Sequence, residues 1–190
     1  MKNNTVLICI LAGIVVCAFW FIGSKNNLVT LREDVRLQQA QVETLLQRRN
    51  DLIPNLVATV KGYTSHEEEI FTEIAEARAK LAGGIMAGDM ESVIEANASL
   101  SSALSRLLVI DEKYPDLTAD EQFTGLRDEI SGSENRISFA RQKYNESVTT
   151  YNTAIQKFPT SVIANMSGFK EMKYFEADED AKDVPVVSFE

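Results

Sequence analysis

The chain opens on an unbroken apolar run and then changes to a helical repeat. From Val6 to Ile22 the sequence reads VLICILAGIVVCAFWFI, with no charged or strongly polar residue. A membrane-spanning helix needs roughly 17–25 apolar residues. Trp20 and Phe21 lie at the end of the run, where aromatic residues of the membrane interface are expected. The pattern therefore predicts a membrane anchor over residues 1–25.

A cleaved signal peptide and a lipoprotein signal are the alternatives to an uncleaved anchor. The run is long for the hydrophobic part of a signal peptide, and no small-residue cleavage site follows it. Cys17 follows Val16, whereas lipid-modified cysteines normally follow a small residue. Orientation stays open, because Lys2 lies on one side of the run and Lys25 on the other. We expect a single-pass protein of the cell membrane.

Beyond the anchor, apolar positions recur every three or four residues, which is typical of helices that pack along one face. Breaks in the repeat separate four predicted helices, at residues 28–62, 65–82, 89–113 and 118–158. The first break is at Gly62, where Thr64 and Ser65 each precede a glutamate by three residues, as in a capping box. The other two are the glycine-rich LAGGIMAGD and the segment YPDLTADEQF, with Asp89 and Thr118 as predicted N-caps.

The lengths of these helices favour one topology. If they run up and down with short loops, the fourth begins beside the end of the first and descends antiparallel to it. Residue 158 then lies near residue 26, and Glu134 lies level with Arg49. A single continuous first and second helix is the alternative, because the apolar stripe nearly continues, but the fourth helix would then overshoot it. The expected fold is all-α: a transmembrane helix followed by an elongated antiparallel up-and-down four-helix bundle over residues 26–177.

Charged residues occupy apolar positions of the first and fourth helices. Arg49 lies on one stripe of the first helix, together with Leu45 and Leu52. Glu134 and Arg141 lie on the stripe of the fourth helix that faces it. Because a buried charge is costly unless it is paired, we predict a polar layer in which Arg49 contacts Glu134. The candidate layer or partner site comprises Arg48, Arg49, Asp51, Glu134, Asn135 and Arg141. Such a layer can fix helix register, as in coiled coils, or bind a partner or an anionic ligand.

Pro54 interrupts the first helix just beyond this layer. Proline removes one helical hydrogen bond and costs about 3 kcal/mol inside a straight helix. We therefore predict a helix kink at Pro54, which either re-aims the rest of the helix or fits the curvature of the bundle.

The segment after the fourth helix is rich in large apolar side chains. It is expected to pack on the membrane-proximal half of the first and fourth helices, which no second helix pair covers. The alternative is docking on a partner or on the bilayer surface. The candidate docking residues are Phe169, Met172, Tyr174 and Phe175. Residues 178–190 are a predicted acidic tail, whose VPVVSF could instead add a strand to a partner's sheet.

Composition and residue counts argue against several classes of function. The net charge of −9 argues against nucleic acid as a partner, because a phosphate-binding surface needs clustered Lys and Arg. Both cysteines, Cys9 and Cys17, lie in the anchor, so no thiol nucleophile or disulfide is expected elsewhere. With His66 as the single histidine, the paired E-x-x-H motifs of a ferritin-like di-iron site are lacking. No P-loop, dinucleotide fingerprint or catalytic triad pattern occurs either. We expect no cofactor, no metal and no enzyme activity.

Three long stretches carry a resemblance to a known family. They read QVETLLQRRNDLIPNLVATVKGYTSHE, RLLVIDEKYPDLTADEQFTGLRDEISGSENRISFARQKYN and YNTAIQKFPTSVIANMSGFKEMKYFEA. Residues 28–177 resemble the LemA family of bacterial membrane proteins, and only Gln39 departs visibly, where a tryptophan is expected. The resemblance implies a membrane-anchored helical bundle without an assigned biochemical activity.

These observations lead to a functional expectation. The protein is expected to be a membrane-tethered, non-enzymatic scaffold or adaptor of the cell envelope. Its expected partners are the lipid bilayer, through residues 6–22, and another membrane or envelope protein or a second copy. The alternatives are a lipid-surface-binding protein, and a sensor or enzyme for a small anionic ligand that uses Arg49, Glu134 and Arg141.

Overall fold

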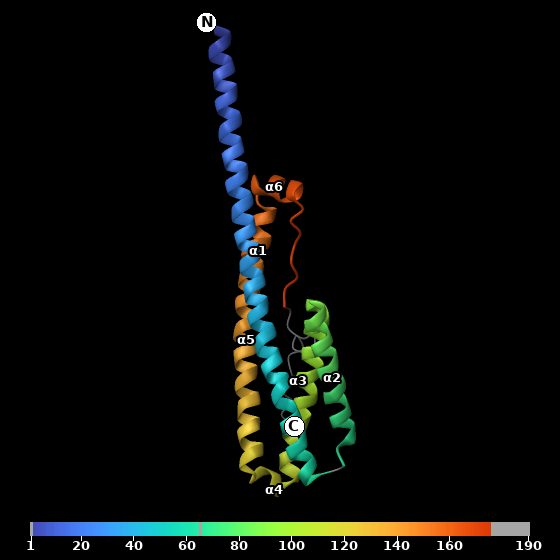
Figure 1. The fold of residues 1–190 in the computed structure, drawn as a ribbon. Coiled ribbons are helices and arrows are strands. Elements are labelled where there is room, and N and C mark those ends of the chain that lie inside the picture. The colour runs from blue at the N-terminus through green and yellow to red at the C-terminus, as the bar shows by residue number, and fades with distance from the viewer. Residues whose placement is uncertain (1, 65, 176–190) are drawn as a thin grey trace, which may run out of the picture. The chain divides into compact units, whose positions relative to one another are not determined.

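The structure, a computed structural model, describes residues 2–64 and 66–175, and all secondary structure in these ranges is helical (Figure 1). The elements are α1 (Lys2–Tyr63), α2 (Glu68–Ala87), α3 (Met90–Val109), the 3₁₀ helix η1 (Ile110–Lys113), α4 (Pro115–Thr118), α5 (Glu121–Gln156) and α6 (Thr160–Ser167). They divide into two compact units. Unit 1 contains Met1–Ala40 and Gln142–Tyr174, and unit 2 contains Gln41–Arg141 together with Phe175. The predicted acidic tail, residues 178–190, lies outside the described residues.

α1 joins the apolar run to the packed part of the chain in one helix of 62 residues. Its side chains from Ile10 to Trp20 are exposed, and the helix is long and apolar enough to cross a membrane. No break separates residue 25 from residue 28, so the predicted anchor and the predicted first helix are parts of one element. Pro54 lies within α1 with its side chain exposed, and the kink there stays a prediction.

The structure separates α1 from α2 at Thr64. The buried Thr64 hydroxyl donates to the Tyr114 hydroxyl at 2.9 Å and accepts from the His66 amide at 3.3 Å. Thr64 is therefore a turn residue and not a helix cap. As a result, α2 begins at Glu68 and not at residue 65, where the capping-box pattern placed its start.

α2 also extends further than predicted, to Ala87 instead of residue 82. Two glycines that were predicted to form a turn are helical. Gly84 is buried against α3: a Cβ at this position would lie 3.1 Å from both Val93 N and Val93 Cγ2. The glycine therefore serves close packing of α2 on α3 and not chain reversal.

The chain reverses one turn later. Gly88 has a φ of 65°, the left-handed conformation in which helices commonly end at glycine. Asp89 then caps α3, as predicted: its carboxylate accepts from the Glu91 amide at 3.1 Å and from the Ser92 amide at 3.4 Å.

The two adjacent glycines of α2 should respond oppositely to alanine. Gly84→Ala is expected to lower the free energy of unfolding by about 1–2 kcal/mol, because backbone atoms of α3 must move. Gly83→Ala should raise it by about 0.5–1 kcal/mol, because nothing lies within 4 Å and alanine favours the helix. Thermal unfolding of the full chain in detergent, followed by circular dichroism, measures both. Equal shifts would contradict the close approach.

The predicted third helix over residues 89–113 is divided. α3 ends at Val109 and tightens into η1, after which Pro115 starts the short α4. Proline disfavours the α conformation in the residue before it, which explains why the helix cannot run on through Tyr114.

α5 begins at Glu121 and not at residue 118. The residue that caps it is Asp120, whose carboxylate accepts from the Phe123 amide at 2.8 Å, and not the predicted Thr118. α5 ends at Gln156, two residues short of the predicted end, before Pro159.

The Asp120 carboxylate also accepts a hydrogen bond from the Tyr63 hydroxyl at 2.6 Å, and this bond lowers the pKa of Asp120. A lowered carboxyl pKa contributes stability that is present above the unfolded value, near pH 4, and that is lost as pH falls through the folded value. Asp120→Asn should therefore lower Tm at pH 7, and its difference from the natural chain should shrink at pH 3. Tyr63→Phe removes the same bond and serves as the matched variant. A constant difference across this pH range would contradict the bond.

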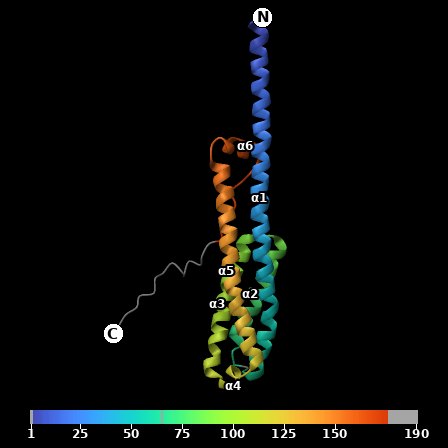
Figure 2. The ribbon, with the colours of Figure 1, turned by 90° about the vertical axis from the view of Figure 1, so that its left-hand side faces the viewer.

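Unit 1 has its own apolar core. In both views α6 lies beside α1 and the end of α5 (Figures 1 and 2). The buried side chains of this unit include Leu28, Val35, Tyr144, Val148, Tyr151, Ile155, Ile163 and Ala164.

Candidate functional site

Arg49 is the largest fully buried side chain, with 1% of its surface exposed. It belongs to the buried face of α1, whose other members are apolar. The buried positions of this face within unit 2 are Val42, Leu46, Arg49, Ile53, Leu56 and Val60, with Asn50 beside them. A charge in such a position needs partners, because the desolvation cost is several kcal/mol.

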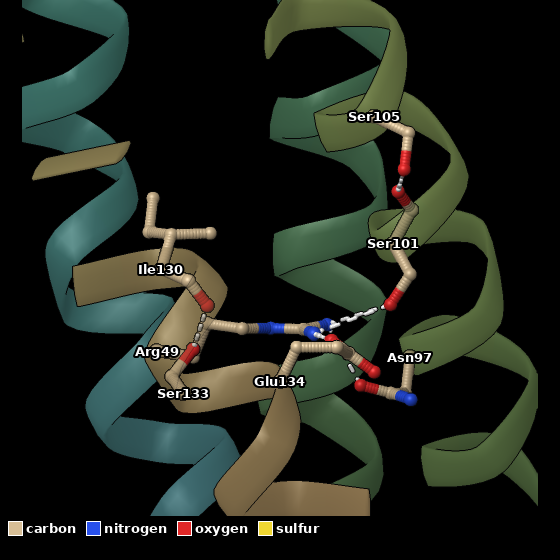
Figure 3. Close-up of polar contacts among 7 residues, drawn as sticks. All are labelled: Arg49, Asn97, Ser101, Ser105, Ile130, Ser133 and Glu134. Carbon is tan, nitrogen blue, oxygen red and sulfur yellow. Dashed lines mark hydrogen bonds and ion pairs between the residues drawn. The ribbon is translucent and has the colours of Figure 1, made fainter. Parts of the chain in front are cut away.

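Two helices, α3 and α5, supply the groups around the guanidinium of Arg49, which α1 carries (Figure 3). From α3, the Asn97 side-chain oxygen accepts from Nη2 at 2.8 Å, and the Ser101 hydroxyl lies 3.2 Å from both Nη1 and Nη2. From α5, the Glu134 carboxylate forms an ion pair with Nη1. Both terminal nitrogens are thus bonded internally, whereas the buried Nε donates to no protein atom that the structure describes. We call Arg49, Asn97, Ser101 and Glu134 the Arg49 cluster.

Burial and neighbouring charges act in opposite directions on Arg49. Burial lowers its pKa below the ordinary value for arginine, the Glu134 carboxylate raises it, and the positive charge of Arg141 lowers it. The guanidinium nevertheless stays protonated at neutral pH, because arginine does not release its proton in proteins. The Glu134 side chain is 46% exposed, so the pair is open to water on the carboxylate side.

Two other predicted layer residues on α1 lie outside the cluster. Arg48 is exposed and donates to Glu129 of α5 at 2.9 Å. Asp51 is exposed and accepts from Gln47 of its own helix at 2.8 Å. Both make surface contacts, which contribute little to stability.

The remaining predicted layer residues belong to α5. Asn135 is exposed. Arg141 is half-buried, and its guanidinium lies over the Phe175 ring at 4.2 Å from the centroid, a cation–π contact. Of the predicted residues, the structure therefore brings Arg49 and Glu134 together in the cluster, with the charge of Arg141 near enough to act on Arg49.

Sequence reasoning missed the neutral members of the site. Asn97 occupies a position of the apolar stripe of α3, which was a signal for a buried polar contact, and Ser101 follows one turn later. A second missed contact lies beside the cluster, where the buried Asn50 accepts from Arg78 Nε of α2 at 3.0 Å. Polar contacts from α1 thus reach α2, α3 and α5.

The chemistry available to the Arg49 cluster is that of a structural ion pair. Its terminal donors are taken by internal acceptors, so an anion could be held in bidentate fashion only after these bonds break. No group of His, Cys, Asp and Glu suited to a metal ion occurs among the described residues. An open pocket of about 830 Å³ in unit 2 is separate from the Arg49 cluster and includes none of its residues. It is lined by Lys61, Thr64, Glu68, Phe71, Thr72, Ala75, Glu76 and Ala79.

The predicted docking segment is held against α5 through its main chain. The buried Asn152 side chain donates to the Met172 carbonyl and accepts from the Met172 amide, each at 2.9 Å. Two tyrosines add to this, because the hydroxyls of Tyr144 and Tyr151 donate to the carbonyls of Lys173 and Lys170, each at 2.9 Å. The amide of Asn152 thus pairs with Met172 as a neighbouring strand would.

The side chains of this segment have different surroundings. Phe169 lies under the Arg32 guanidinium at 5.3 Å, and Phe175 is 2% exposed. Met172 is half-buried and Tyr174 is 40% exposed. The segment packs within the protein, and docking of its exposed side chains on a partner stays a prediction.

Comparison with known proteins identifies the family. The profile of the LemA family matches residues 38–189. Magnetosome protein MamQ of Magnetospirillum gryphiswaldense is 28% identical over 186 residues, which cover 86% of this chain and 68% of MamQ. Magnetosome protein MamQ 2 of Paramagnetospirillum magneticum is 27% identical over the same shares. Protein LemA of Metamycoplasma hominis is 26% identical over 161 residues, covering 85% of this chain and 73% of that protein. Because the family match spans more than half of the sequence, the chain belongs to the LemA family.

Proposed function

We propose that the protein is a membrane-tethered, non-enzymatic scaffold or adaptor of the cell envelope, with α1 as its single transmembrane helix. One observation carries the proposal. The helix that exposes its apolar side chains from Ile10 to Trp20 continues without a break into unit 2, where it supplies Arg49. Because the Arg49 side chain is fully buried in unit 2, the helix that carries the tether is also an integral part of a folded unit.

The chemistry of unit 2 supports a role without catalysis. Both terminal nitrogens of Arg49 are bonded within the cluster, and among the described contacts of Arg49 the one titratable base is the carboxylate of Glu134, which is already paired with it. The names of the relatives refer to the magnetosome or to the family, and not to a reaction. We infer that unit 2 presents a surface for another envelope protein.

The arrangement of unit 2 suits such a surface. We infer that α2, α3 and the adjoining parts of α1 and α5 form the antiparallel up-and-down four-helix bundle expected from the sequence. Support comes from the tight reversal at Gly88 and Asp89, from the close approach at Gly84, and from the contacts of Arg49 with α3 and α5.

The tether is tested by charging its exposed side chains. Val15→Lys combined with Val16→Lys should move the full chain from the carbonate-resistant membrane fraction to the soluble fraction, because each charge at mid-bilayer costs about 2.5–3.5 kcal/mol. Val15→Leu with Val16→Leu is the matched control and should leave the chain in the membrane. A doubly charged variant that stays in the membrane fraction would contradict the tether.

The adaptor role is tested by crosslinking in cells from a photoreactive residue at Met86, which is 89% exposed in unit 2. We expect one dominant envelope partner, and its loss when the charged tether variant releases the chain. The rival role, binding of a small anion, predicts instead a raised Tm with some member of an anion set, and loss of that shift in Arg49→Lys. A reproducible shift of this kind, without a protein crosslink, would overturn the adaptor role.

A further inference from the structure

α6 exposes an apolar face in unit 1. Val162 is 51% exposed and Met166, one turn later, is 74% exposed. Phe158, just before the helix, is 84% exposed. On the side of α6 that packs on the protein, Ile163 and Ala164 are each 1% exposed. The helix is therefore apolar on both sides, although only one of them packs on the protein.

The orientation of this helix is fixed by its packing. Ile163 and Ala164 set its rotation about the helix axis, since both lie in the core of unit 1. Gly168, with a φ of 74°, closes the helix, and the Phe169 amide donates to the Ala164 carbonyl at 3.0 Å. Val162 and Met166 consequently stay outward, which is costly in water for large apolar side chains unless something covers them.

Charge is distributed unevenly around this face. The chain has 28 acidic residues, yet none occurs in residues 1–32 or 147–170. The second of these stretches contains α6 and two exposed lysines, Lys157 and Lys170, and the first contributes the exposed Lys25. Glu171 follows directly and bonds to Gln156. Even so, in a protein with a net charge of −9, unit 1 has eight Lys and Arg residues against four Asp and Glu residues and is positive. This suits an anionic surface, because lysines beside apolar side chains favour anionic lipid head groups.

The position of α6 along α1 brings it close to the end of the apolar run. Phe169, next to the end of α6, lies under Arg32, ten residues after Ile22 and thus about 15 Å along the helix. Arg32 also acts on Tyr151 of α5. In both views of unit 1, α5 runs back toward the N-terminal part of α1 (Figures 1 and 2). It continues from Tyr151 to Gln156, about 7 Å, before Phe158 and α6 follow.

The start of α6 therefore lies about 8 Å beyond the level of Ile22. The polar head-group region of a bilayer is about 5–8 Å deep on each side of the hydrocarbon layer. An apolar, positively flanked helix at this level meets lipid head groups if α1 crosses the membrane as proposed.

We propose that α6 is a second membrane contact, in which Phe158, Val162 and Met166 enter the interface of the bilayer that α1 crosses and Lys157 and Lys170 contact anionic lipid phosphates. The inference rests on the proposed tether. It assigns α6 to the lipid surface and not to a protein partner, because the surrounding charge is positive in an otherwise acidic chain. A helix held on the surface beside a transmembrane helix also restricts how unit 1 tilts.

The test uses full-length chain in vesicles of phosphatidylcholine and phosphatidylglycerol that contain a shallow nitroxide-labelled lipid. With Cys9→Ser and Cys17→Ser, an environment-sensitive fluorophore is attached at Met166→Cys or, as the control, at Thr150→Cys, an exposed position on α5. We expect the label at position 166 to be quenched at least three-fold more than the label at position 150. Vesicles of phosphatidylcholine alone should reduce quenching at position 166, because the lysines lose their anionic partners.

Trp20, the single tryptophan, reports separately on the tether in the same samples. Quenched Trp20 with equal, weak quenching at positions 166 and 150 would overturn the contact of α6 and leave the tether intact. Unquenched Trp20 would overturn the tether and with it this inference. A label at position 166 that is shielded from lipid but transfers energy to a second labelled chain would also overturn it, in favour of a second copy.

Discussion

Arg49→Ala is expected to lower the free energy of unfolding of the full-length chain by about 2–4 kcal/mol. The change removes a fully buried side chain and leaves the Asn97 oxygen and the Ser101 hydroxyl without their donor. Glu134 loses its ion pair as well, but its half-exposed carboxylate is rehydrated, which places the loss below that of a fully buried pair. Thermal unfolding in detergent micelles should show a decrease in Tm of about 5–12 °C.

Arg48→Ala is the matched control, because it removes the neighbouring guanidinium of the same helix. The Arg48 side chain is 62% exposed, and its ion pair with Glu129 lies at the surface. The expected loss is below about 0.5 kcal/mol. Arg49→Lys should lie closer to alanine than to arginine, since an ammonium group cannot bond Asn97, Ser101 and Glu134 from one plane. Equal losses for Arg48→Ala and Arg49→Ala would show that the cluster does not hold unit 2 together.

An unchanged Tm in Arg49→Ala combined with loss of the Met86 crosslink would have a different meaning. The cluster would then serve a partner and not the fold. The two roles are separable because stability and crosslinking are read from the same variant.

The helical class could be predicted from sequence because apolar spacing reports directly on the period of a helix. The rotation of α1 about its own axis, which decides which of its residues are buried, was predicted less accurately. The sequence placed Leu45 and Leu52 on the stripe of Arg49, whereas the structure buries Leu46 and Ile53 fully and leaves the other two half-buried. α1 makes contacts with α2, α3 and α5 in unit 2, so its buried face is wider than a single seam.

Helix ends depended on contacts that no local pattern reports. Thr64 and Thr118 both stand three residues before a glutamate, yet neither caps a helix. The Thr64 hydroxyl bonds to Tyr114, fifty residues away in sequence, and Asp120 takes over the cap of α5 while accepting from Tyr63. In a chain with many glutamates, the capping-box pattern recurs by chance, and tertiary partners decide which instance is used.

The polar site was predictable in part, for a similar reason. A charged residue at an apolar position of a helical stripe is easily recognised in the sequence, so the pairing of Arg49 with Glu134 could be predicted. Arg48 and Asn135 were grouped with them because they are adjacent in sequence, but adjacent helical residues point about 100° apart, and both are exposed. Asn97 and Ser101 were missed because neutral polar side chains cost less free energy to bury than charges, so their presence on an apolar stripe is a weaker signal of a buried polar site.

Asn152→Asp is expected to release the segment of residues 168–175 from α5. The change is nearly isosteric and keeps one oxygen for the Met172 amide, but it replaces the donor to the Met172 carbonyl by a second acceptor. A lost hydrogen bond and a repulsive contact in a buried position cost about 2–3 kcal/mol. Amide hydrogen exchange at Met172 should therefore accelerate about 30- to 150-fold.

Gln156→Ala controls for removal of a hydrogen bond to the same segment, because Gln156 and Glu171 are both exposed and bond through side chains only. It should leave exchange at Met172 within about two-fold, as expected for a surface contact. Unchanged exchange in Asn152→Asp would contradict the strand-like pairing. The variant also separates the two interpretations of the segment. A docking segment, once released, should give stronger crosslinks to a partner from a photoreactive residue at Tyr174, whereas a segment that only completes the core of unit 1 should give none.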